Sequence, residues 1–305
     1  MPKSTRKQIR ISLPRNFNFW ATVYSHGWCA LPPFRIDKEN RTLSLVVDGK
    51  SNRQYALTLH PEKGELVARL GADADPSAAE RSIIAHGVST VLRLDESFDL
   101  FYKEARRFPR YRWVVKRHAG RLLRSGSVFE DVVKMVCTTN CSWALTETMI
   151  EALVTKLGVC IADGVFAFPT PAAIASRSES SLRKEIRCGY RAPYLLELSR
   201  RVAEGSLKLE GWRTSTQSTE ELFEEVRSIK GVGEYAAGNI LKLLGRYDYL
   251  GLDSWTRGKF YELFKSGRKV KDSTIEKHYA QFGSWRGLFM WMDMTKEWYE
   301  KEFPL

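Results

Sequence analysis

Apolar and polar residues alternate along much of residues 1–94, which is the pattern of β-strands with one buried face. Three runs rich in β-forming residues, separated by Gly, Pro and Asp, cover residues 42–47, 54–59 and 65–70. Residues 74–81 have the composition of a short capped helix, and the apolar, β-branched run at 88–94 predicts one more strand. We therefore expect an antiparallel sheet with one or two helices in this part.

From Asp95 onward the apolar residues recur at spacings of three and four, which is typical of helices that bury one side. The predicted helices include residues 128–136, 143–154, 194–202, 219–226, 285–298 and the segments that follow residues 229–235 and Asp253. The sequence thus predicts an α+β fold, with an antiparallel sheet domain at 1–94 and a large helical body at 95–305. A division of that body into two helical lobes beside a cleft stays open.

Lysine and arginine outnumber aspartate and glutamate by 48 to 36, which gives a formal net charge of +12. This charge favours a polyanionic partner, above all nucleic acid, although a basic surface also keeps proteins soluble. No apolar run is long enough to span a membrane and the basic N-terminus lacks an apolar signal core, so we expect a cytoplasmic or nucleoid-associated protein. The five cysteines lack metal-ligand spacing, which predicts reduced thiols and no metal site.

The most informative segment begins with Ile-Lys-Gly-Val-Gly-Glu-Tyr at residues 229–235. Glycine permits positive φ and lets a phosphate approach the backbone, and N–H groups at the start of a helix attract anions. Gly231, Val232 and Gly233 precede an Ala-rich apolar helix face, so they predict a helix-hairpin-helix that holds a phosphate. A glycine turn with a purely structural role is the alternative.

A lone acid, Asp253, follows in the sequence Gly-Leu-Asp-Ser-Trp-Thr-Arg. Taken by itself it is best interpreted as the N-cap of a helix, since aspartate is among the preferred residues there. Its position eighteen residues after Tyr235 favours a second role, because the hairpin and the carboxylate would then meet on one nucleotide. A helix N-terminus also favours the ionised form of the carboxylate.

Together these residues resemble the helix-hairpin-helix superfamily of DNA glycosylases, which is marked by a Gly/Pro-rich loop and a distal aspartate. The resemblance spans nearly the whole chain and is nearest the branch of 8-oxoguanine DNA glycosylases and 3-methyladenine DNA glycosylase II. It implies that Gly231, Val232 and Gly233 bind the DNA backbone and that Asp253 assists cleavage of the N-glycosidic bond. Such a carboxylate would stabilise oxocarbenium character in the sugar or activate a water, once the base has left the stack.

Two departures from the family pattern change the expected chemistry. Tyr235 stands where bifunctional members carry the lysine that forms a Schiff base, and tyrosine cannot form that imine; Lys230 or Lys242 would need a different reach. No cysteine follows Cys188, whereas members with an iron–sulfur cluster need four clustered thiolates there. The resemblance therefore implies a monofunctional enzyme without a cofactor, with a structural cation at the hairpin left open.

Further matches concern how the duplex and the base are held. Asn140 resembles the residue that enters the space left by a flipped nucleotide, and Tyr190 and Arg191 resemble the wedge and the contact to the unpaired base. Exposed turn residues of these types are ordinarily only solvated, so both interpretations stay open. The candidate residues of the base pocket are aromatic, although most of the nine tryptophans are expected in the core. They are Trp143, Phe289 and Trp291.

Leu145 and Gly287 stand where 8-oxoguanine enzymes carry an arginine and a glutamine, which weakens a strict 8-oxoguanine assignment. We therefore expect a monomeric, monofunctional glycosylase that acts on double-stranded DNA with a damaged purine, with alkylated purines favoured. The alternatives are an 8-oxoguanine-type glycosylase with weak lyase activity, a non-catalytic DNA-damage-binding protein and a helical scaffold. Retention of Asp253 argues against a pure binder, because binding to a polyanion needs no acid.

Overall fold

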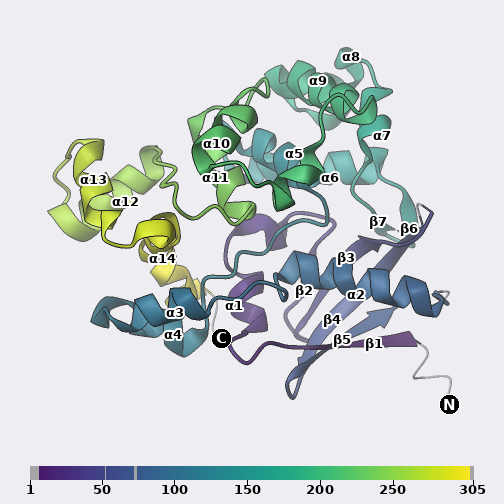
Figure 1. Cartoon of the computed structure of the whole chain (residues 1–305). Coiled ribbons are helices and arrows are strands. Elements are labelled where there is room, and N and C mark those ends of the chain that lie inside the picture. The colour runs from purple at the N-terminus through teal and green to yellow at the C-terminus, as the bar shows by residue number, and fades with distance from the viewer. Residues whose placement is uncertain (1–6, 52, 72–73, 303–305) are drawn as a thin grey trace. The chain divides into compact units, whose positions relative to one another are not determined.

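The structure, a computed structural model, describes residues 7–51, 53–71 and 74–302. A five-stranded antiparallel sheet forms the N-terminal part and most of the later chain is helical, which confirms the predicted α+β fold (Figure 1). The chain divides into two compact units. The first unit is Met1–Ser97 with Arg121–Leu209, and the second unit is Phe98–Gly120 with Glu210–Leu305.

This division differs from the boundary at residue 94 that the change of pattern predicts. The sheet segment is joined to the chain beyond residue 121 by buried hydrogen bonds. Trp28 Nε1 donates to Asp131 at 2.8 Å, and Arg93 Nε donates to the carbonyl oxygen of Leu122 at 2.9 Å. The boundary between the sheet and the helices is therefore not the boundary between the two compact units.

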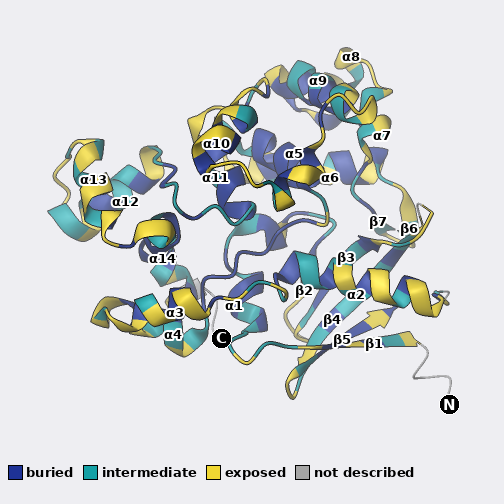
Figure 2. Cartoon of the chain, viewed as in Figure 1, coloured by how far each residue is buried: buried dark blue, intermediate teal, exposed yellow. Residues whose placement is uncertain are grey.

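The sheet buries one face under a helix. Its strands lie in the order β1 (Gln8–Ser12), β5 (Glu65–Leu70), β4 (Gln54–Glu62), β3 (Thr42–Asp48) and β2 (Arg35–Asp37). Alternate residues of β3 and β4 are buried, as the pattern predicts, and Leu45 pairs with Leu57 in register. Helix α2 (Ala78–Leu92) covers this face, where Gly87 lies against Val47. Figure 2 shows α2 with exposed residues along the rest of its surface.

The strand expected at residues 88–94 is wrong, because residues 88–92 complete helix α2 and Arg93 is its C-cap. Ser77 and Glu80 form a capping box at its start: the Glu80 N–H donates to Ser77 Oγ, and the Ser77 N–H donates to Glu80 Oε2. Ile84, Val88 and Val91 are then buried at helical spacing against the sheet. A short apolar run cannot be assigned to helix or strand by periodicity alone. Here the capping box at Ser77 begins a helix that continues through this run.

The remainder of the first unit is helical apart from one small hairpin, β6 (Cys160–Ala162) with β7 (Val165–Phe166). Its other helices are α1 (Phe19–Val23), α5 (Val128–Thr138), α6 (Trp143–Leu157), α7 (Pro171–Ala175), α8 (Glu179–Ser181) and α9 (Ala192–Ala203). Helices α5, α6 and α9 correspond to three predicted ones. Residues 128–137 of α5 are all buried, including the ion pair of Lys134 and Glu130 at 2.6 Å, so α5 is the central helix of this unit.

The second unit consists of helices joined by short links. They are α3 (Asp99–Arg106), α4 (Arg112–Arg117), α10 (Thr219–Arg227), α11 (Glu234–Leu243), α12 (Ser254–Lys265), α13 (Asp272–Ala280) and α14 (Arg286–Glu297). The apolar pattern predicts α10, α11, α12 and α14 but not α13. Among the helices that the structure describes, none is both long enough and apolar enough to cross a membrane.

A buried carboxylate ties three segments of the second unit together. Asp293 of α14 accepts hydrogen bonds from the Tyr111 hydroxyl at 2.7 Å and the Tyr279 hydroxyl at 3.0 Å. It also pairs with Arg110, whose Nε lies 2.6 Å from Oδ1. Burial and the Asp293 charge raise the pKa of both tyrosines well above the ordinary value, so both stay neutral donors.

We expect Asp293→Ala to lower the free energy of unfolding by about 3–5 kcal/mol, because two buried hydroxyls and one guanidinium lose their acceptor. Chemical denaturation measures this change. Glu179→Ala is the control, since it removes the exposed ion pair with Arg183 and should cost under about 1 kcal/mol. Equal losses in the two variants would contradict the structural role of Asp293.

Candidate functional site

The glycine hairpin lies between α10 and α11 and leaves the start of α11 open. Gly231 has φ of +88°, a left-handed conformation that favours glycine, and the Val232 N–H donates to the Ile229 carbonyl at 3.0 Å. Gly233 is exposed and is the N-cap of α11, where it has no side chain to satisfy the first N–H groups. A helix N-terminus of this kind favours an anion, and the binding of a DNA phosphate here stays a prediction.

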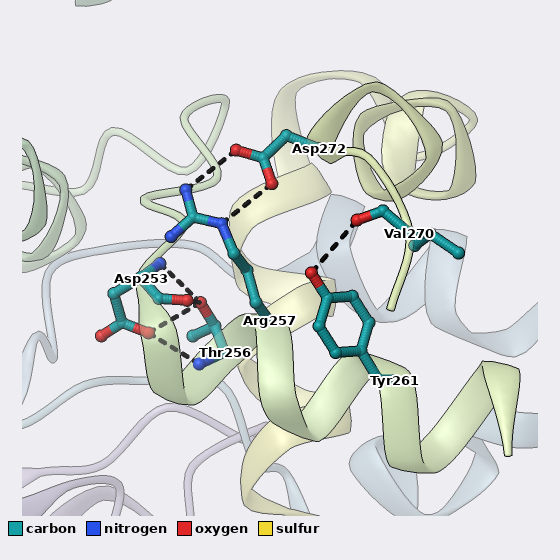
Figure 3. Close-up of polar contacts among 6 residues, drawn as sticks. All are labelled: Asp253, Thr256, Arg257, Tyr261, Val270 and Asp272. Atoms are coloured by element: carbon teal, nitrogen blue, oxygen red, sulfur yellow. Dashed lines mark hydrogen bonds and ion pairs between the residues drawn. The ribbon is translucent and has the colours of Figure 1, made fainter. Parts of the chain in front are cut away.

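Asp253 begins α12 and has one oxygen in a helix cap. Its Oδ1 accepts hydrogen bonds from the Thr256 N–H at 2.6 Å and the Thr256 hydroxyl at 2.8 Å, while the Asp253 N–H donates to Thr256 Oγ1. Within the described residues Oδ2 accepts no hydrogen bond, and Figure 3 shows it directed away from Thr256. The cap and a chemical role are therefore compatible, because each uses a different oxygen.

Figure 3 also shows how the first turns of α12 are held. Arg257 makes a bidentate pair with Asp272, with both N···O distances at 2.8 Å. The Tyr261 hydroxyl donates to the carbonyl of Val270 at 3.1 Å. These bonds connect one face of α12 to the link before α13 and to the first residue of α13, so they anchor the helix that presents Asp253.

A contact between two glycines sets the position of Asp253 relative to α11. A Cβ atom on Gly238 would lie 2.7 Å from Gly251 Cα and 2.9 Å from the Tyr249 ring. Gly251 itself has φ of +61°, and Asp253 follows it by two residues. The link at residues 245–253 therefore touches α11 backbone to backbone, which any larger side chain at residue 238 would prevent.

The same link is held on its other side by α14. The Gly287 N–H donates to the Tyr247 carbonyl at 2.7 Å, and the Arg286 guanidinium donates to the carbonyl of Asp248. A Cβ atom on Gly287 would lie 2.1 Å from the Tyr249 carbonyl oxygen. Glycine at 287 is thus required by this packing, and a base-reading glutamine could not stand there without displacing the link.

Lys242 and a tryptophan cluster complete the surroundings of Asp253. Lys242 is 2% exposed, and its Nζ lies 4.8 Å from the centroid of the Trp291 ring. Trp255, directly after the start of α12, has its ring centroid 6.0 Å from that of Trp291. Burial lowers the pKa of Lys242 to about 8, and the nearby Asp253 charge opposes that shift. The sequence pattern does not predict this role for Lys242 or Trp255, although the spacing of seven from Tyr235 places Lys242 on the same face of α11.

Phe289, predicted to line a base pocket, instead belongs to the aromatic core of the second unit. It has no exposed surface, and its ring stacks on Phe282 with centroids 4.2 Å apart and an interplanar angle of 24°. Phe101 and Tyr111 close the remaining sides at 4.9 and 4.6 Å. The prediction for Phe289 is corrected for this reason: the face of α14 that carries it points inward. Trp291, two residues on, is partly exposed.

In the first unit, the residues predicted to contact the duplex lie together although they are fifty residues apart in sequence. Asn140 has φ of +48° in the turn before α6, and its Nδ2 lies 3.5 Å from the Tyr190 hydroxyl. That hydroxyl donates to the Thr139 carbonyl at 3.3 Å. Asn140 and Tyr190 are both exposed, so they present an amide and an aromatic ring to solvent side by side.

Arg191 differs from its predicted role, because it lies behind this pair. It is 4% exposed, its guanidinium donates to the Thr139 carbonyl, and it stacks on the Tyr190 ring at 4.5 Å. In this arrangement Arg191 supports Tyr190 and does not face solvent as a base contact would. Its exposure was predicted because arginine is usually exposed and because it lies in a turn. Neither property shows that its side chain packs against Tyr190.

Trp143, the third predicted pocket residue, begins α6 in the first unit and is 41% exposed. Its Nε1 donates to Glu147 at 2.8 Å. The ring covers Gly27 so closely that a Cβ atom there would lie 2.4 Å from it. Trp143 therefore combines a fixed orientation with an accessible face.

No group of three or more His, Cys, Asp or Glu side chains suited to a metal ion occurs in the part of the chain that the structure describes. Cys29, Cys137 and Cys188 are buried, and none of the five cysteines forms a disulfide. Burial raises the pKa of Cys188 to about 11, so this thiol is protonated at neutral pH.

Comparison with known proteins identifies the region that contains the hairpin. Residues 133–285 match the model of a family described as HhH-GPD superfamily base excision DNA repair protein. The chain is 25% identical over 185 residues to "Putative DNA-3-methyladenine glycosylase YfjP" of Bacillus subtilis (strain 168). That match covers 58% of this chain and 63% of the relative, so the chain spans less than two thirds of that protein.

Solved structures share the fold at low sequence identity. The 3-methyladenine DNA glycosylase from Archaeoglobus fulgidus has a TM-score of 0.75 at 20% identity, over 95% of this chain and 99% of that one. An 8-oxoguanine glycosylase/lyase of Clostridium acetobutylicum, in complex with double-stranded DNA, has a TM-score of 0.72 at 20% identity. The alignment covers 94% of this chain and 93% of that one, and these likenesses establish the common fold.

The glycine contact predicts opposite stability effects for two similar substitutions. Gly238→Ala should lower the free energy of unfolding by about 1–3 kcal/mol, because the new methyl group overlaps the Gly251 backbone. Gly258→Ala, inside α12 with open space around it, should raise it by about 0.5–1 kcal/mol. Chemical denaturation of both variants tests the contact, and stabilisation by Gly238→Ala would contradict it.

Proposed function

The chain belongs to the HhH-GPD superfamily of base excision DNA repair proteins, and from this premise we propose that it is a DNA glycosylase that hydrolyses the N-glycosidic bond of a damaged purine. One observation carries the proposal: the second unit holds an open helix N-terminus and a carboxylate with one uncommitted oxygen on segments in backbone contact. The first suits a DNA phosphate and the second suits the sugar next to it. In the first unit, the exposed Asn140 is proposed to enter the space that a flipped nucleotide leaves in the duplex, and the exposed Tyr190 is proposed to wedge between bases.

In the proposed reaction, Asp253 acts on the deoxyribose through Oδ2. The C1′–N bond breaks with its electron pair moving to the base, and positive charge develops on the sugar. The carboxylate lowers the free energy of that charge, and it accepts a proton from the water that attacks C1′. Because Oδ1 is held by Thr256, the carboxylate does not have to reorganise during the reaction.

The proposed enzyme is monofunctional and works without a cofactor. Tyr235, 36% exposed at the start of α11, has no amine with which to attack C1′. Lys230 is exposed in the hairpin, before the turn of Gly231, and Lys242 is buried behind the ring of Trp291. Neither amine therefore shares the position of Tyr235, so base release without strand cleavage is the expected outcome.

The proposed substrate class follows from the aromatic side chains near Asp253 and from the lack of the arginine and glutamine that 8-oxoguanine enzymes carry. Trp255 and Trp291 offer flat surfaces beside Asp253 for a purine ring. Leu145 and Gly287 cannot supply the arginine and glutamine of an 8-oxoguanine-type site, and the packing of Gly287 leaves no room for the latter. An alkylated purine in double-stranded DNA is favoured for this reason, and 8-oxoguanine remains the alternative in the test.

We expect the protein, incubated with duplexes that each contain one lesion, to give strand cleavage only after alkali treatment. Borohydride should trap no covalent complex, since tyrosine forms no imine. Asp253→Asn should lower the single-turnover rate on the order of a hundredfold, while asparagine preserves the helix cap and hence the fold.

The matched control for that experiment is Glu262→Gln, which removes an exposed acid of the same helix that pairs with Lys259 and leaves Asp253 and its cap unchanged. Its rate should stay close to that of the unmodified protein. Trapping by borohydride would contradict monofunctional chemistry. Tight lesion binding without base release on any duplex would favour a damage-binding protein instead.

Tyr190 provides a separate test of duplex contact by the first unit. Tyr190→Ala should weaken binding to a lesion duplex about tenfold, because an aromatic surface that stacks on bases is lost. Tyr190→Phe keeps the ring and loses only the hydroxyl bond to Thr139, so its affinity should stay near the original. Fluorescence anisotropy measures both, and equal weakening by the two variants would assign the effect to the hydroxyl.

A further inference from the structure

Lys242 lies deep on the face of α11 that leads to the candidate site. It follows Tyr235 by seven residues, which is two helical turns, so the two share a face and are about 10 Å apart along the axis. Its side chain is almost completely buried, and the ammonium lies over the Trp291 ring at 4.8 Å from the centroid. A buried lysine is costly, and this one contacts the residue proposed to line the base site.

The charge of Lys242 is present under ordinary conditions. Burial lowers the pKa of its ammonium to about 8, and among charged groups of the described residues Asp253 is the one whose field opposes this shift. At pH 7 the protonated form is therefore the major one. A positive charge on one face of Trp291 and the negative charge of Asp253 thus act on the same region.

A cation already bound over an aromatic ring weakens the attraction of that ring for a second cation, because the two positive charges repel each other. Damaged purines differ in this respect: alkylation at a ring nitrogen leaves a fixed positive charge, whereas etheno and oxo adducts are uncharged. The bases also differ as leaving groups. A cationic base leaves as a neutral molecule, but an uncharged base receives the bond pair as a developing anion unless it is protonated.

We propose that Lys242 makes the base site selective for uncharged damaged purines over purines with a fixed positive charge. The inference rests on the proposed glycosylase function and narrows the favoured alkylated purines to those whose adduct is uncharged, such as 1,N6-ethenoadenine. The ammonium repels a cationic base at Trp291 and stabilises the negative charge that develops on a departing uncharged base, so binding and chemistry favour the same class. Lys242 acts here through the field at the base site, without bonding to the sugar.

The test compares two duplexes that differ only in the lesion, 1,N6-ethenoadenine as the uncharged base and 7-methylguanine as the cationic one. Single-turnover release rates are measured for the unmodified protein, Lys242→Met and Lys242→Arg. In Lys242→Met the ratio of uncharged to cationic release should fall on the order of tenfold, the effect of one charge at about 10 Å in an effective dielectric of about 20. Lys242→Arg keeps the charge and should keep most of the ratio. A change of both rates by one common factor would overturn the inference and assign Lys242 to packing.

A pH profile of the unmodified protein gives an answer even if Lys242→Met does not fold. The lysine is charged below its pKa of about 8 and neutral above it, so the rate ratio should be highest below pH 8 and fall as the pH rises through it. Because 7-methylguanine itself loses its N1 proton near neutral pH, Lys242→Arg supplies the reference profile, since its charge persists over this range. The same pH dependence of the ratio in the unmodified protein and in Lys242→Arg contradicts the proposal.

Failure of this inference can be told apart from failure of the proposed function. If the unmodified protein releases neither base, nor any other damaged purine in the panel, the glycosylase proposal itself fails. If release occurs and is lost in Asp253→Asn, but the ratio is insensitive to Lys242, only the selectivity proposal fails.

Discussion

The second unit depends on one constraint, the close approach of the link at residues 245–253 to two helices at once. On the α11 side Gly238 meets Gly251, and on the α14 side Gly287 lies against the backbone of Tyr247 and Tyr249. Side chains are missing where the backbones touch, so the link has little freedom to shift. Asp253 is the residue that this link delivers to the start of α12. Its position therefore depends on the lack of side chains at Gly238, Gly251 and Gly287, and on the hydrogen bond from the Gly287 N–H to the Tyr247 carbonyl.

Three groups of different charge surround Asp253 or include it. The N-terminus of α11 is positive in character and has no side-chain cap, Asp253 is negative and half capped, and Lys242 is a buried cation behind Trp291. A phosphodiester would meet the first, the sugar the second and the base the third. Under the proposed function, separate groups would thus face the three parts of one nucleotide, whereas the net charge of +12 alone would attract DNA without distinguishing these parts.

Local signals in the sequence were sufficient for much of this. The alternation in β3 and β4, the turn at Gly231 and the cap at Asp253 depend on neighbours within a few residues, and each was predicted correctly as a structural feature. The failures share a different cause. The run at 88–94 joined a helix because of a cap at Ser77, and Phe289 is buried because of aromatic residues far away in sequence. Arg191 and Lys242 are charged residues whose type predicts exposure, and only tertiary packing shows that both are buried behind aromatic rings.

Tyr235 and Lys242 are best understood together. In the family pattern a lysine at the position of Tyr235 supplies the amine that attacks the sugar. This chain has tyrosine there, and a lysine two helical turns further along the same face, where Trp291 covers it. This face of α11 therefore has a buried ammonium at residue 242 and no amine at residue 235. Under the proposed function, the site would act by electrostatics and not by covalent attack. Asp253 would then act on the sugar, and the buried ammonium would act on the base.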